Sequence, residues 1–179
     1  VLLLLILVNA FYVAAEFAAV SVRQSRIQQR AEEGNWFAIR LLPYIDSSHR
    51  LDRYIATSQI GITISSLVLG AYGQTHLAPV MVPLFEGMGG MQAAGAQSAA
   101  FVVVLLVLTA AHMILGELVP KALALQYPTH VALYTLLPMQ WSVRGFSWFI
   151  SLLNGSGRAV VRLFGVKQGG HVHIHSPEE

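Results

Sequence analysis

The sequence predicts an all-α membrane protein in which three transmembrane helices are joined by helices at the membrane surface. Hydrophobic residues make up 55% of the 179 residues and charged residues only 11%, against about 25% charged in soluble domains. Three apolar runs are long enough to cross a hydrocarbon core, which takes about 20 helical residues. A chain of this length holds several spans but no soluble enzyme domain beside them. With no cysteine, disulfides and thiolate metal sites are excluded.

The first predicted span covers residues 1–22. It is longer than the apolar region of a signal peptide, which favours a true span, and since it starts without Met we expect the natural N-terminus further upstream. The polar stretch Arg23–Arg53 contains apolar residues such as Trp36 and Leu41. This mixture predicts one or two interfacial helices, with a break at Gly34–Asn35.

The second span is predicted over Tyr54–Tyr72 and is rich in Ser, Thr and Gly, residues that allow close helix packing in lipid. Gln74–Gln97 holds Pro and Gly residues and predicts a loop, with room for a short apolar hairpin at Val80–Phe85. The third span is predicted over Ser98–Leu118, and Pro120-Lys121 is expected to end or kink it.

The last apolar segment, Thr129–Leu153, is either a fourth span or a belt along the interface, and its tryptophans favour contact with headgroups. Residues 169–179, GGHVHIHSPEE, are predicted to form a linker. Its alternating His171, His173 and His175 resemble a metal-binding tract, but three histidines at this period are more often a polar edge.

The basic residues predict the orientation. Six arginines lie between the first two spans, none lies in Gln74–Gln97, and further basic residues follow the third span. By the positive-inside rule, the first loop and the C-terminus are expected in the cytoplasm and the N-terminus outside. The calculated pI is near 9.2, but a formal net charge of +2 fits membrane topology better than nucleic-acid binding.

Two acids, Glu16 and Glu117, lie within the predicted spans, where a charge costs at least roughly 2.5–3.5 kcal/mol. Pro120 lacks an N–H, so the carbonyl of Gly116 loses its helical donor. Gly116 has no side chain, which would let an ion approach its oxygen. These residues predict a cation site at Gly116 and Glu117. The alternative is a helix end at which Glu117 reaches the interface beside Lys121.

Glu16 either binds the ion or holds the first helix to polar partners, and the structural role is favoured. Ser21 lies five residues further on and is within its reach if the helix is locally widened. On the second span most hydroxyls are expected to bond to the preceding turn. Ser65 is the first choice for a ligand and Thr63 the second. Ser66 and Pro120 join Glu16 as second-tier candidates, and His112 is expected to be a hydrogen-bonding partner.

Carboxylate, hydroxyl and carbonyl oxygens suit hard cations, namely Mg²⁺, Ca²⁺, Mn²⁺ or Na⁺. Ligand type does not separate these ions. An intramembrane enzyme is disfavoured because the HxxxGE sequence lacks the spacing of a zinc protease.

Three stretches resemble the transmembrane domain of the CNNM/CorC magnesium transporters: Asn9–Asn35, Ser58–Gly70 and Gly116–Pro128. The resemblance implies a homodimer with three transmembrane helices and a juxtamembrane belt over residues 1–168. It implies a Mg²⁺ site facing the cytoplasm, among Ser21, the second helix and Gly116-Glu117. It also makes Thr129–Leu153 more a belt than a span. A nucleotide-binding CBS pair would follow the linker, so no nucleotide is expected to bind here.

The sequence therefore predicts a Mg²⁺ transporter of a bacterial plasma membrane that exports the ion, with Na⁺ exchange suggested by the family alone. Membrane lipids are expected partners, and nucleic acid is not. The rival hypothesis is a membrane anchor or regulator whose acids only hold helices together.

Overall fold

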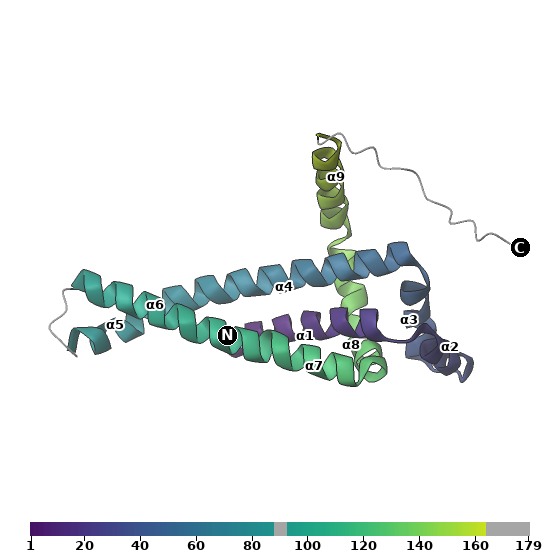
Figure 1. Cartoon of the computed structure of the whole chain (residues 1–179), viewed down its shortest axis with the longest axis horizontal. Helices are drawn as coiled ribbons and strands as arrows, with labels where there is room; N and C mark the ends of the chain where they lie inside the picture. Colours follow the sequence, from purple (N-terminus) through teal and green to yellow (C-terminus); the bar gives the residue numbers. More distant parts are fainter. Residues whose placement is uncertain (88–92, 164–179) are drawn as a thin grey trace, which may run out of the picture.

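The computed structural model describes residues 1–87 and 93–163, so the predicted linker and its histidine tract lie outside the described residues. Every element in the described part is helical. Three helices are long and apolar enough to cross a membrane, as predicted: α1 (Leu2–Ser21), α4 (Ser48–His76) and a continuous helix over Ala93–Gln126. They run along the long axis of the molecule (Figure 1).

The third span does not end at Pro120. It comprises α6 (Ala93–Ala111), a π-helix η1 (His112–Leu118) and α7 (Val119–Gln126). Pro120 lies inside this continuous helix, just after η1, where its missing N–H interrupts α-helical bonding. The π turn before it carries the backbone past the missing N–H, so the helix continues for two further turns.

The prediction of a loop over Gln74–Gln97 is wrong for most of the segment. Helix α4 continues to His76, and α5 (Ala78–Gly87) follows at once with Pro83 inside it. Ala78 packs against Val104 and Leu108 of α6. This apolar contact with the neighbouring span stabilises a helix that the Pro and Gly content argued against.

The polar stretch after α1 forms two short helices, as predicted, α2 (Gln24–Glu32) and α3 (Trp36–Asp46). They separate at Gly34, whose φ of 83° is readily adopted only by glycine. The side chain of Asn35 then accepts a hydrogen bond from the Ala38 N–H at 3.1 Å and caps α3.

The segment Thr129–Leu153 is divided between two helices, α8 (Pro128–Gly145) and α9 (Ser147–Leu163). Neither is among the three candidate spans, and both lie across the long helices in Figure 1. Trp141 and Trp148 are 73% and 69% exposed, as expected of side chains at headgroup depth. The belt interpretation fits this arrangement, and the fourth-span alternative does not.

The main buried cluster lies where α1 ends and meets α2, α3, α7 and α8; its members are Ala18, Val22, Ile27, Ala38, Leu41, Ala124, Ala132, Leu133 and Leu136. The spans themselves approach closely at glycines of α4. A Cβ at Gly61 would overlap the Tyr12 ring of α1, and one at Gly73 would overlap Leu108 of α6. Small residues thus hold α4 against both neighbouring spans.

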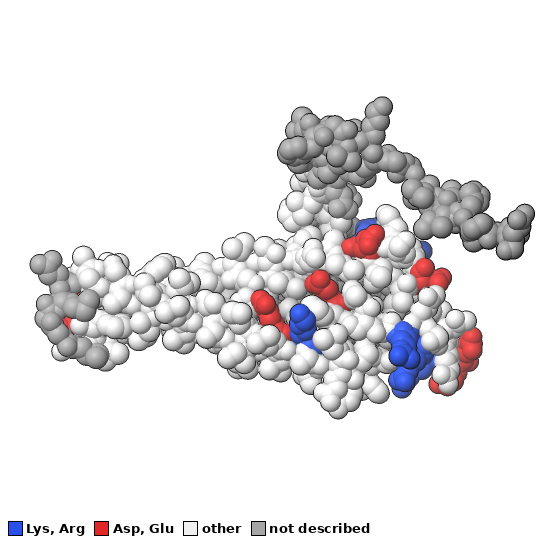
Figure 2. All heavy atoms as spheres, in the orientation of Figure 1, with Lys and Arg blue, Asp and Glu red and all other residues white. Residues whose placement is uncertain are grey.

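Charged side chains gather at the end of the molecule that carries α2 and α3, whereas the stretch where α4 and α6 run together is nearly free of them (Figure 2). This distribution is that of a membrane protein with one strongly basic interface.

Cysteine labelling tests the predicted orientation. Ser48 and Glu86 are exposed near opposite ends of the molecule, and the chain has no native cysteine. We expect S48C to react with a membrane-impermeant maleimide only from the cytoplasmic side and E86C only from the outside. Labelling of both from the same face would overturn the orientation.

Candidate functional site

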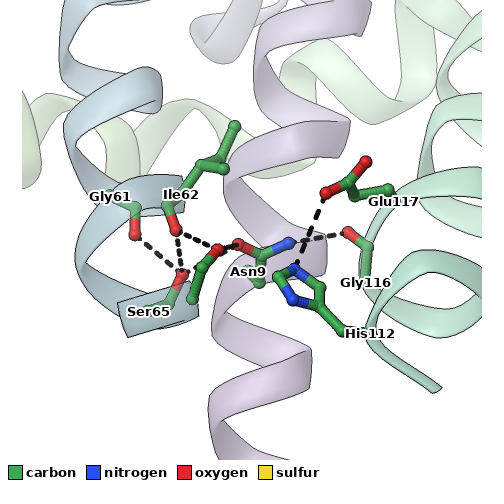
Figure 3. Close-up of polar contacts among 8 residues, drawn as sticks. Asn9, Gly61, Ile62, Ser65, His112, Gly116 and Glu117 are labelled. Atoms are coloured by element: carbon green, nitrogen blue, oxygen red, sulfur yellow. Dashed lines mark hydrogen bonds and ion pairs between the residues drawn. The ribbon is translucent and has the colours of Figure 1, made fainter. Parts of the chain in front are cut away.

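Among the described residues, Asn9 is the centre of the buried polar cluster that joins all three spans. Its side chain is 0% exposed. The Asn9 Nδ2 group donates to the Gly116 carbonyl of η1 at 3.0 Å. The Asn9 Oδ1 atom accepts from the hydroxyls of Ser65 and Ser66 on α4 at 2.9 and 3.3 Å. One amide of α1 therefore ties α4 to η1 (Figure 3).

The α4 side of this cluster is rich in acceptor oxygens. The Ser65 Oγ lies 2.9 Å from Asn9 Oδ1, 2.8 Å from the Gly61 carbonyl and 3.0 Å from the Ile62 carbonyl. The Ser66 Oγ lies 2.6 Å from the same Ile62 carbonyl. Each hydroxyl has a single proton to donate, so the Ser65 hydroxyl cannot serve all three of its neighbouring oxygens at once. Such a group of oxygens is chemically suited to a cation.

The η1 side of the cluster follows from Pro120. In an α-helix the Gly116 carbonyl would accept from residue 120, which has no N–H. The chain instead adopts π-type bonding, with the Val119 N–H donating to the Ile114 carbonyl, and the Gly116 carbonyl receives the Asn9 amide. The prediction that this carbonyl loses its helical donor is thus consistent with the structure, in which a side chain takes the donor's place.

Gly116 also lies in a crowded place between η1 and α1. A Cβ at this position would lie 2.6 Å from His112 Cδ2 and 3.1 Å from Asn9 Nδ2. Any larger residue would push Asn9 away from the carbonyl, because the His112 ring fills the remaining space. Glycine is required here for close approach.

Glu117 and His112 form a pair on η1. The Glu117 Oε1 lies 3.8 Å from His112 Nε2, and their side chains are 50% and 15% exposed. Five residues separate them, a spacing that the wider π turn brings together. Figure 3 shows both projecting from η1 toward α1. His112 Nε2 is buried with no hydrogen-bond partner, so this ring nitrogen can still form a hydrogen bond beside the Asn9 cluster.

Glu16 lies outside this cluster. It is partly buried on α1, and the amide side chain of Gln59 on α4 faces its carboxylate. A polar neighbour on another helix is compatible with the structural role favoured from the sequence, which stays a prediction. Helix α1 is a regular α-helix over its whole length, so the local widening that would bring Glu16 to Ser21 is not present.

Ser21 and Thr63 lie away from the cluster. Ser21 follows Asn9 by twelve residues on α1, which is about 18 Å along the axis. Thr63 is exposed and donates to the Gln59 carbonyl at 2.8 Å. The structure thus brings together Ser65, Ser66 and Gly116 of the predicted residues through Asn9. Glu117 follows Gly116 on η1 and Pro120 lies four residues after it, whereas Ser21, Thr63 and Glu16 lie apart.

Two other hydroxyls of α4 behave as expected for a membrane helix. Thr57 and Ser58 donate to the carbonyls of Arg53 and Tyr54, at 2.8 and 3.2 Å. Only Ser65 and Ser66 also reach α1.

Asn9 carries no charge, so it does not stand out in the sequence as Glu16 and Glu117 do. A single amide in the first apolar run was the available signal, since an amide in hydrocarbon must find a partner.

The described residues contain no group of three or more His, Asp and Glu side chains able to hold a metal. The donors at the site are one carboxylate, one imidazole and several neutral oxygens. This set can bind a hard cation only through hydroxyl, amide and carbonyl oxygens, with Glu117 supplying the charge.

Comparison with known proteins identifies relatives along the whole chain. The chain matches the family described as the cyclin M (CNNM) transmembrane N-terminal domain over residues 1–179. It is 37% identical to the protein YrkA of Bacillus subtilis (strain 168) over 177 residues, 98% of this chain and 40% of that protein. It is 35% identical to the protein Rv1841c of Mycobacterium tuberculosis (strain H37Rv) over 175 residues, 96% of this chain and 48% of that protein.

A third relative carries a functional name. The polyamine export protein of Haemophilus influenzae is 26% identical over 171 residues, 93% of this chain and 38% of that protein. The chain thus spans less than half the length of these relatives. The match over the full chain, together with three spans and a belt of short helices, shows that this protein belongs to the cyclin M (CNNM) transmembrane domain family.

Proposed function

We propose that this domain transports Mg²⁺ across the membrane through the cluster of Asn9, Ser65, Ser66 and Gly116, with Glu117 beside it. The observation that carries the proposal is Asn9, a fully buried amide that holds hydroxyl and carbonyl oxygens of three spans together at membrane depth. An anchor domain needs no such oxygen-rich group, since apolar packing of the kind seen at Gly61 would hold its helices together.

The donors suit Mg²⁺ in type and number. Mg²⁺ takes about six oxygens at roughly 2.0–2.1 Å. The cluster offers Asn9 Oδ1, the Ser65 and Ser66 hydroxyls, and the Gly116 carbonyl, with the Gly61 and Ile62 carbonyls next to them. The Gly116 carbonyl is held by Asn9 Nδ2, so an incoming ion would replace that N–H as the partner of the oxygen.

Glu117 supplies the charge that the neutral oxygens lack. Its carboxylate is half exposed on the surface of a single subunit, where contact with lipid would cost roughly 2.5–3.5 kcal/mol or more. A second subunit or a water-filled path at this surface would remove that cost. This supports the homodimer implied by the family resemblance.

The direction of transport, the orientation in the membrane and the exchanged ion are proposed from the family and from the charge distribution. We propose export from a bacterial cytoplasm, with the N-terminus outside and the basic belt inside, as the arginine distribution predicts. Exchange against Na⁺ is compatible with the same oxygen ligands, because Na⁺ is also a hard cation.

Polyamine export is the second candidate, and the named relative favours it. A polyamine is a long organic cation whose ammonium groups pair with carboxylates and aromatic rings. Glu16 and Glu117 supply carboxylates, but Asn9, Ser65 and Gly116 are in direct contact, so an alkylammonium group would have to separate them further than a small ion would. The compact oxygen cluster therefore favours a small ion.

The charge of Glu117 can be tested directly. We expect E117Q to weaken Mg²⁺ binding roughly 10- to 100-fold, because it keeps the side-chain shape and removes the only carboxylate near the cluster. Saturable thermal stabilisation of the detergent-solubilised protein by Mg²⁺ measures this affinity. E86Q, which removes a charge from the exposed end of α5, is the matched control and should bind like wild type. Equal Mg²⁺ stabilisation of wild type and E117Q would sink the assignment.

Pro120 gives a second test, in which stability and affinity move in different directions. In P120A the new N–H can bond to the Gly116 carbonyl in place of Asn9 Nδ2, so the π turn should relax toward an α-helix. We expect a melting temperature without Mg²⁺ at least equal to that of wild type, since alanine suits a helix better. We expect Mg²⁺ affinity to fall roughly five-fold, the equivalent of about 1 kcal/mol for one oxygen contact. A P120A protein that melts lower and keeps wild-type affinity would show that the proline serves only packing.

A further inference from the structure

A second polar feature lies at the basic interface, separate from the Asn9 cluster. A cavity of about 690 Å³ opens between α3, the start of α4 and the end of α8, within the range of roughly 300–1,000 Å³ usual for ligand pockets. Four arginines line it: Arg40 of α3, Arg50 and Arg53 of α4, and Arg144 of α8. Its other walls include the Tyr44 ring and the apolar Val143.

Among the described residues, no carboxylate lines this cavity. Within residues 1–87 and 93–163, the sole acid–base contact of 4.0 Å or less joins His112 to Glu117, so none of the four guanidinium groups has a carboxylate partner there. Arg40 lies over the Trp36 ring at 4.0 Å, a contact that leaves the N–H edges of its guanidinium group available. A second cavity, lined by Arg23, Arg26 and Arg30, also contains Glu33 and so has a carboxylate of its own.

The residues around the cavity are those expected at headgroup depth. Arg50 and Arg53 begin α4 before its apolar part, and the tryptophans Trp141 and Trp148 of α8 and α9 are exposed close to Arg144 in sequence. The positive-inside rule accounts for arginines in this loop. It does not require four of them, from three helices, to line one cavity whose remaining walls are partly apolar.

We propose that this cavity binds an individual anionic phospholipid, with the phosphate held by Arg50, Arg53 and Arg144. Guanidinium groups match the geometry of phosphate oxygens with paired N–H donors. The apolar wall at Val143 would contact the glycerol and upper acyl chain, which a free phosphate ion lacks. Basic pockets between membrane helices recognise lipid headgroups by this chemistry. Lipid binding in this cavity would involve no residue of the Asn9 cluster and does not depend on which ion is transported.

The test is a lipid titration of the protein in neutral detergent, read as thermal stabilisation. We expect phosphatidylglycerol to raise the melting temperature saturably and phosphatidylcholine not to. R53Q should weaken the apparent affinity roughly five-fold or more, and R53K should lose part of it, because lysine keeps the charge but not the paired donors. R144Q, on another helix, should behave like R53Q. Melting without lipid checks that each variant is folded.

R26Q is the matched control, since it removes one arginine of the same loop from the cavity that contains Glu33. It should retain affinity for phosphatidylglycerol within about two-fold, as expected for an exposed charge screened by salt. Equal losses in R26Q and R53Q would show general charge attraction and overturn the site. Equal stabilisation by phosphatidylcholine would do the same. Saturable stabilisation by inorganic phosphate alone, at matched concentration, would assign the cavity to a soluble anion and overturn the lipid proposal.

Discussion

The arrangement of the spans depends on one amide that has to be satisfied without water. Asn9 lies in a predominantly apolar helix and is fully buried. An unpaired amide there would cost several kcal/mol. The Asn9 Nδ2 group donates to the Gly116 carbonyl of η1, and the Asn9 Oδ1 atom accepts from the Ser65 hydroxyl of α4, so both polar atoms of the amide are hydrogen-bonded. The same contacts that stabilise the packing of α1, α4 and η1 also gather the oxygens of the proposed ion site, so stability and function share one network.

The π-helix follows from the same constraint. Pro120 removes the donor for the Gly116 carbonyl, and Gly116 leaves room for the Asn9 amide to reach that oxygen. The wider turn also brings His112 to Glu117. A single proline therefore determines which side chains meet at the cluster, and the site is a consequence of how η1 departs from an α-helix. An ion that replaced Asn9 Nδ2 at the carbonyl would loosen α1 from η1, which is a physical route from binding to movement of the spans.

Sequence patterns predicted the spans and the belt because those depend on the length and periodicity of apolar runs. Glu117, Ser65 and Ser66 could be named because a charge or hydroxyl in hydrocarbon is visible in the sequence, and Gly116 because Pro120 lies four residues after it. Asn9 carries no charge and owes its role to partners 56 and 107 residues away, which no local pattern contains. Helix α5 was missed because its packing against Val104 and Leu108 outweighs its local Pro and Gly content. Ser21 was named by resemblance, and only the position of η1 along α1 shows that it lies apart.

The most direct test of this account is ion flux in proteoliposomes that contain the protein and an enclosed Mg²⁺-sensitive dye. Under an imposed Mg²⁺ gradient, wild-type protein should carry Mg²⁺. The variant N9L, checked for intact folding before reconstitution, should carry little or none, because leucine fills the space of the amide and supplies no oxygen. Radiolabelled putrescine under an equal gradient should not be transported. Wild-type flux in N9L, or putrescine transport without Mg²⁺ transport in the wild type, would contradict the claim that the Asn9 cluster is the path of a small cation.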